Sequence, residues 1–89
     1  MANVLLAEDD GDVATALGLA LSAAGHRVRR AADGVQAIEV VRRDEVDVAV
    51  LDLLLPRKGG LEVAAAIREG SGVPIVLVTG IYRGASRRE

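Results

Sequence analysis

The sequence contains no cysteine, tryptophan or phenylalanine, and only one tyrosine, one histidine and two prolines among its 89 residues. The lack of cysteine excludes a disulfide scaffold, a thiolate zinc site and a cysteine nucleophile. The single histidine, His26, cannot supply the usual zinc ligand sets. Because aromatic residues are so scarce, the hydrophobic core has to be built from aliphatic side chains.

Long apolar runs are also absent. No stretch approaches the ~20 residues that a membrane-spanning helix needs, and residues 1–3 lack the basic start of a signal peptide. We therefore expect a cytoplasmic protein that does not associate with membranes. The length predicts one domain, which buries only about 60–65% of the surface that its unfolded chain exposes.

Charge is distributed unevenly along the chain, although the formal net charge is only -2. Residues 1–26 hold no lysine or arginine but four acidic residues within five positions: Glu8, Asp9, Asp10 and Asp12. The last residues are basic, with Arg83, Arg87 and Arg88. For these arginines a solvated surface is favoured over a phosphate-binding patch. Since aromatic stacking platforms are missing too, we expect no nucleic-acid binding.

Hydrophobic patterning predicts alternating strands and helices. Short apolar or alternating runs predict strands over residues 4–7, 27–31, 46–51 and 75–78. Helical spacing of apolar residues predicts helices over residues 13–24, 33–43 and 61–70, the first ending at Gly25 and the second capped by Asp33. The order β-α-β-α-β-α-β predicts an α/β fold, with a parallel sheet and helices on both faces.

In open parallel sheets, ligands bind beyond the carboxyl ends of the strands. Three polar segments occupy such places: Glu8–Asp10, Asp52 and Thr79. Converging carboxylates repel one another unless they take up protons or bind a hard cation such as Mg²⁺. A carboxylate can also act as a nucleophile toward phosphorus, and the Thr79 hydroxyl could hydrogen-bond a phosphoryl oxygen. The alternative interpretation is that the acidic residues only cap the helix that follows them.

Four segments, in order and at matching spacing, resemble a response-regulator receiver domain, the phosphoacceptor module of two-component signalling. Val4–Asp10 is similar to the family's first strand and acidic pair, and Asp33–Gly34 to the turn before its second helix. Val50–Gly60 resembles the phosphorylation segment, with proline four and glycine eight residues after the aspartate. Pro74–Gly80 resembles the fourth strand and its threonine or serine.

The resemblance implies a flavodoxin-like, doubly wound sheet and a role for each matching residue. Asp52 would be the phosphoacceptor, and a sensor histidine kinase or a phosphotransfer protein would be the donor. Mg²⁺ would be held by Glu8, Asp9, Asp52 and the backbone carbonyl of Leu54. Thr79 would be the switch hydroxyl that moves toward the phosphoryl group.

The sequence also departs from the family. We expect residues 1–89 to form one receiver-like domain whose C-terminal third is missing, namely most of the fourth helix, the fifth strand and the fifth helix. A lysine that pairs with the phosphoryl group, an aromatic switch residue and the usual output face would be lost with it. Tyr82 lies in the wrong segment to replace that aromatic residue. Gly59 stands where many members carry aspartate.

Two functions of different classes therefore stay open. The first is a phosphorylation-dependent switch on Asp52. The second is a phosphorylation-independent interaction module that forms homo-oligomers through the apolar edge of Ile75–Val78. An enzyme is not expected: a phosphatase with an aspartyl nucleophile is disfavoured because Leu54 offers no acid two residues after Asp52.

Overall fold

The computed structural model describes residues 1–78, which form a four-stranded parallel sheet in the order β2-β1-β3-β4. The strands are β1 (Asn3–Ala7), β2 (Arg27–Ala31), β3 (Val48–Asp52) and β4 (Ile75–Val78). The helices are α1 (Gly11–Ala23), α2 (Gly34–Arg43) and α3 (Gly60–Gly70). The predicted α/β class and flavodoxin-like strand order are confirmed for these elements.

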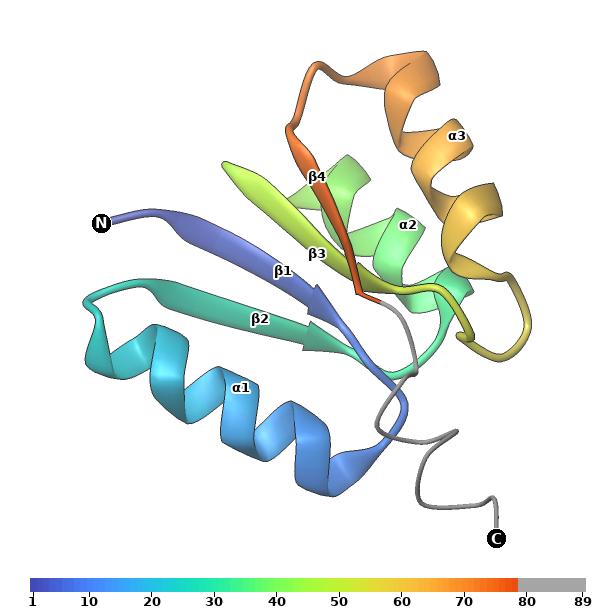
Figure 1. Cartoon of the computed structure of the whole chain (residues 1–89). Coiled ribbons are helices and arrows are strands. Elements are labelled where there is room, and N and C mark those ends of the chain that lie inside the picture. Colours follow the sequence, from blue (N-terminus) through green and yellow to red (C-terminus); the bar gives the residue numbers. More distant parts are fainter. Residues whose placement is uncertain (79–89) are drawn as a thin grey trace, which may run out of the picture.

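Helices cover both faces of the sheet, as Figure 1 shows, with α1 on one face and α2 and α3 on the other. The hydrophobic core lies between the sheet and the α2–α3 layer, where Leu5, Leu51 and Val63 are completely buried. Within residues 1–78 this core consists of leucine, isoleucine, valine and alanine side chains, as the sequence predicts. The contact between α1 and the sheet is less completely buried, since Leu17 and Leu21 on the predicted apolar face of α1 are only half-buried.

Both ends of the third strand differ from the sequence prediction, and several other element ends are shifted by one or two residues. The third strand begins at Val48 rather than at Val46. Asp47 is used to anchor the start of β1 instead: its Oδ2 accepts a hydrogen bond from the Asn3 N–H at 2.7 Å, and its own N–H donates to the Asn3 carbonyl at 2.7 Å. The same strand includes Asp52 as its last residue.

The helix ends follow the predicted capping chemistry. Asp33 caps α2, since its Oδ1 accepts from the Gln36 N–H at 2.9 Å. Gly25 follows α1 with a φ of 93°, a left-handed conformation that glycine adopts without a steric penalty. Within residues 1–78, no helix is both long and apolar enough to cross a membrane.

Candidate metal centre

Strand register brings two of the predicted site residues side by side. Ala7 of β1 pairs with Leu51 of β3, so that the next residues along, Glu8 and Asp52, lie at neighbouring positions. Because side chains alternate across a strand, both point to the sheet face opposite the buried Leu5 and Leu51. Glu8 and Asp52 are 1% and 2% exposed, an unusual burial for two carboxylates.

Asp9 completes a cluster of three carboxylates. One oxygen from each of Glu8, Asp9 and Asp52 lies within 4.8 Å of the other two, with Asp9 at the exposed side. In an octahedral Mg²⁺ shell, neighbouring oxygens are about 3 Å apart and opposite ones about 4.2 Å. Three ligands of one octahedral ion include at most one opposite pair, so the cluster holds such an ion once its other oxygen pairs close from at most 4.8 Å to about 3 Å, by up to about 1.8 Å. The predicted convergence of these three residues is what the structure shows.

The carboxylate of the next acidic residue, Asp10, caps the helix that follows. Asp10 is the N-cap of α1, and its Oδ1 accepts from the N–H groups of Asp12 and Val13 at 2.9 and 3.1 Å. Its own N–H donates to Oε2 of Glu8 at 3.1 Å, which fixes how that carboxylate is turned. The two interpretations of the acidic run thus apply to different residues, since Asp10 caps the helix while Glu8 and Asp9 face Asp52.

The loop after β3 also contacts the acidic cluster, through Leu54. The Leu54 N–H donates to Oδ1 of Asp52 at 3.0 Å, which restrains rotation of that carboxylate. The role of the Leu54 carbonyl as a metal ligand stays a prediction. Thr79, Gly80 and Tyr82 lie outside the described residues, as do the three arginines near the end of the chain.

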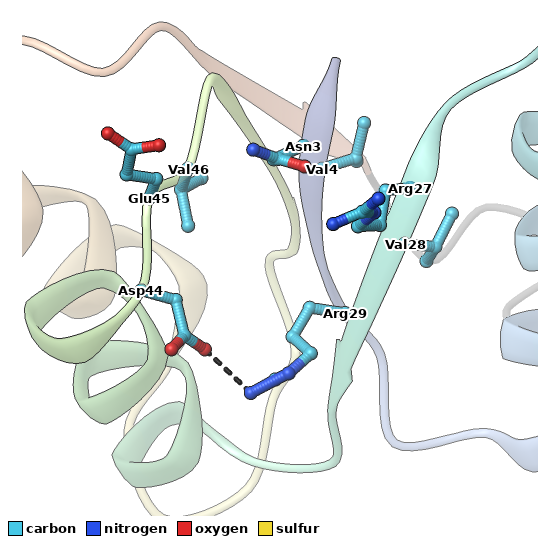
Figure 2. Close-up of a pocket in the computed structure, with 8 residues that line it drawn as sticks. All are labelled: Asn3, Val4, Arg27, Val28, Arg29, Asp44, Glu45 and Val46. Carbon is cyan, nitrogen blue, oxygen red and sulfur yellow. Dashed lines mark ion pairs between the residues drawn. The ribbon is translucent and has the colours of Figure 1, made fainter. Parts of the chain in front are cut away.

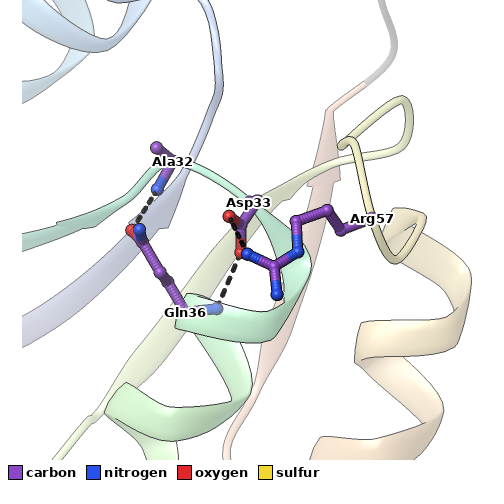
Figure 3. Close-up of polar contacts among 4 residues, drawn as sticks. All are labelled: Ala32, Asp33, Gln36 and Arg57. Carbon is purple, nitrogen blue, oxygen red and sulfur yellow. Dashed lines mark hydrogen bonds and ion pairs between the residues drawn. The ribbon is translucent and has the colours of Figure 1, made fainter.

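A close backbone contact holds this loop, residues 53–59, against the start of α2. The Gly34 N–H donates to the Pro56 carbonyl at 3.3 Å, and a Cβ at position 34 would collide with the carbonyl oxygen of Lys58. Figure 3 shows Arg57 reaching back to Asp33, with Nη1 and Oδ2 3.3 Å apart. Arg57 itself adopts a φ of 70°, which is uncommon for a residue with a side chain.

Gly59, the position where many family members carry aspartate, gives α3 no side-chain cap. Its N–H instead donates to Oε1 of Glu62 at 3.3 Å. A glycine at this position weakens a helix start by only a few tenths of a kcal/mol relative to aspartate. The glycine at this position therefore weakens the start of α3 only slightly.

Two cavities in the described part of the chain are lined by other residues than the acidic cluster. One of about 410 Å³ lies at the amino ends of β1 and β2, where Arg29 pairs with Asp44 at 2.8 Å (Figure 2). Another, of about 360 Å³, lies between the C-terminal halves of α2 and α3. Both are remote from the carboxyl ends of the strands.

Sequence analysis did not single out one residue that contacts the backbone of the acidic cluster. Arg30, near the end of β2, donates hydrogen bonds to the backbone carbonyls of Glu8 and Asp9. Nothing in the pattern of residues 27–31 marks it, because Arg27 and Arg29 in the same strand look equivalent in sequence. Only the pairing of β2 with β1 distinguishes it.

Comparison with known proteins matches the chain to response regulators. The family model described as "Response regulator receiver domain" matches residues 4–87. The chain is 43% identical to the transcriptional regulatory protein AfsQ1 of Streptomyces coelicolor, in an alignment that covers 89% of this chain. It is also 43% identical to the response regulator MprA of Mycobacterium leprae, in an alignment that covers 85% of this chain. It spans only about a third of these relatives, 35% and 34% of their lengths.

Solved structures show the same fold. The response regulator TrrA of Thermotoga maritima, in complex with Mg²⁺-BeF, matches with a TM-score of 0.87 and 27% identity, over 99% of this chain and 77% of that one. TrrA in complex with the histidine kinase ThkA matches with a TM-score of 0.83 and 29% identity, over 89% and 69% of the two chains.

Proposed function

The chain belongs to the response regulator receiver domain family, and from this membership we propose that Asp52 accepts a phosphoryl group from a sensor histidine kinase or a phosphotransfer protein. The observation that carries the proposal is the cluster of Glu8, Asp9 and Asp52 at the carboxyl ends of β1 and β3. The complex of TrrA with a histidine kinase supports the class of partner. Residues 1–89 act as one receiver domain in this proposal.

In the proposed reaction an Asp52 oxygen attacks phosphorus and forms the new P–O bond. The P–N bond of the donor's phosphohistidine breaks, and its electron pair stays on the imidazole nitrogen. The Leu54 N–H holds the attacking carboxylate in one orientation. Thr79 would then hydrogen-bond the transferred group, and the loops around it would shift between two states.

Glu8, Asp9, Asp52 and the carbonyl of Leu54 would hold Mg²⁺ in this proposal. When bound, the ion would offset the negative charge of the carboxylate and of the transferring phosphoryl group. The complex of TrrA with Mg²⁺-BeF supports this choice of metal. The protein is thus an acceptor in phosphotransfer rather than an enzyme that turns over a substrate.

Intact-mass measurement after incubation with Mg²⁺ and a small acyl-phosphate donor tests the proposal. We expect a mass increase of one phosphoryl group that needs Mg²⁺ and disappears in Asp52→Asn. Asp12→Asn is the matched control: it removes one carboxylate from the same acidic run but lies outside the cluster, so it should still form the adduct. An adduct of equal yield in Asp52→Asn would contradict the proposal.

A second function, self-association, is favoured by one observation. Val76 and Leu77 of β4 are 51% and 41% exposed, and in residues 1–78 this strand has a neighbouring strand on one side only. The opposite edge, β2, carries three arginines, which discourage pairing with another strand. We therefore also propose that β4 pairs with a second copy of the chain.

Sedimentation velocity over a range of concentrations tests this second function. Val76→Lys should convert the wild-type dimer to monomer, because it places a charge on the edge strand. Leu19→Lys is the control, since Leu19 is an exposed apolar residue on α1, away from that edge. A wild-type chain that stays monomeric at high concentration would contradict the proposed pairing.

A further inference from the structure

The β1–α1 loop, residues 8–10, is held by one side chain from a strand far away in sequence. Arg30 of β2 directs Nε and Nη2 to the Glu8 carbonyl oxygen, at 3.3 and 3.0 Å. Nη2 also lies 3.4 Å from the Asp9 carbonyl oxygen. The planar guanidinium thus contacts the backbone of both adjacent acidic residues of the cluster at once.

The backbone of β2 holds the same loop through the next residue. The Glu8 N–H donates to the Ala31 carbonyl at 3.0 Å, which continues the pairing of β1 with β2 beyond the end of β1. The peptide groups on both sides of Glu8 are therefore fixed by Arg30 and Ala31. Because its backbone cannot rotate freely, the direction of the Glu8 side chain toward Asp52 is set before any ion binds.

From these contacts we infer that Arg30 is a positioning residue for the metal site, holding Glu8 and Asp9 in the arrangement that binds a divalent cation. This inference rests on the proposed function, because that function supplies the cation. Arg30 does not touch the carboxylate oxygens in these hydrogen bonds. It acts through the backbone, as side chains outside a metal's own ligand set commonly do.

The charge of Arg30 has the opposite effect on a cation, and this makes the inference testable. A guanidinium near the cluster repels Mg²⁺, so removing it would strengthen binding if its charge were its main contribution. If positioning dominates, removing it weakens binding. Lysine keeps the charge but lacks the planar fork that reaches two carbonyls, so it separates the two effects.

Arg29 offers a matched control in the same strand. Its side chain pairs with Asp44, which follows α2, and not with the β1–α1 loop (Figure 2). Arg29→Met changes the net charge by the same amount as Arg30→Met and leaves the β1–α1 loop untouched. It therefore controls both for charge and for the loss of a long side chain on β2.

The experiment is a calorimetric Mg²⁺ titration of the whole chain, wild type against Arg30→Met, Arg30→Lys and Arg29→Met. We expect Arg30→Met to raise the Mg²⁺ dissociation constant about tenfold, at the lower end of effects for such supporting residues, because Arg30 is exposed. Arg30→Lys should fall between it and the wild type, and Arg29→Met should match the wild type. Arg30→Met that binds Mg²⁺ as tightly as the wild type, or more tightly, would overturn the inference.

A second measurement, made without metal, keeps the inference separate from the proposed function. Hydrogen exchange of the Glu8 and Asp10 amides should accelerate in Arg30→Met but not in Arg29→Met, with circular dichroism showing that both variants are folded. Unchanged exchange at both amides would overturn the positioning role. A wild-type chain that binds no Mg²⁺ would instead contradict the proposed function, while the exchange data would still decide whether Arg30 orders the loop.

Discussion

The approach of Gly60 to the end of β3 gives a prediction that links stability to the site. A Cβ built at Gly60 would lie 2.5 Å from the Asp52 carbonyl oxygen and 2.7 Å from the Leu53 Cα. Both of these atoms belong to the backbone, so no side-chain rotation can relieve the collision. In Gly60→Ala the start of α3 has to move away from the residue that we propose as the phosphoacceptor.

The change in unfolding free energy of Gly60→Ala follows from two opposing effects. Forcing one extra carbon into a packed region costs about 1–3 kcal/mol. Replacing glycine by alanine in a helix returns up to about 1 kcal/mol. We expect a net loss of about 1–2 kcal/mol, which lowers the melting temperature by roughly 4–16 °C in a domain of this size.

Gly18→Ala is the matched control. Gly18 lies inside α1, and a Cβ there meets nothing within 4 Å. The same substitution should therefore stabilise the protein by up to about 1 kcal/mol. Thermal and urea unfolding followed by far-ultraviolet circular dichroism measures both variants. The reasoning is refuted if Gly60→Ala is as stable as the wild type, or if the two variants shift in the same direction.

Two further predictions concern metal binding and the start of α2. Mg²⁺ at ten times its dissociation constant should stabilise the wild type by about 1.4 kcal/mol in thermal unfolding. This stabilisation should vanish in Asp52→Asn and on chelation of the ion. If Mg²⁺ stabilised Asp52→Asn as much as the wild type, the ion would not be bound at Asp52. Asp33→Ala should cost about 1 kcal/mol in urea unfolding, because α2 loses its N-cap. Arg57→Ala should cost much less, since its ion pair with Asp33 is exposed to solvent, and an equal cost would show that the ion pair matters more than the cap.

Periodicity and turn residues were enough to predict the element order, because apolar spacing reports directly which side chains face a core. They also predicted the α2 cap at Asp33 and the left-handed Gly25, where local backbone chemistry decides the conformation. The start of β3 was wrong because Asp47 bonds to Asn3, forty-four positions earlier in the chain. No local pattern reveals a contact of that kind.

The candidate site was predictable to the extent that strand ends define it. Glu8, Asp9 and Asp52 follow from the rule that ligands bind at the carboxyl ends of parallel strands, together with the resemblance to receiver domains. Arg30 was not predictable, because its hydrogen bonds depend on the register of β2 against β1. The contact of Gly34 with the loop after β3 also depends on tertiary packing rather than on local sequence.

The central claim is that Asp52 is the residue that takes the phosphoryl group while Mg²⁺ lies among the three carboxylates. Peptide mapping of the phosphorylated chain tests it most directly, with the acyl phosphate trapped by borohydride, which converts a phosphorylated aspartate to homoserine. We predict homoserine at position 52 alone, and none when Mg²⁺ is omitted. Modification at Glu8 or Asp9 in place of Asp52, or a yield at position 52 that does not depend on Mg²⁺, would contradict the claim.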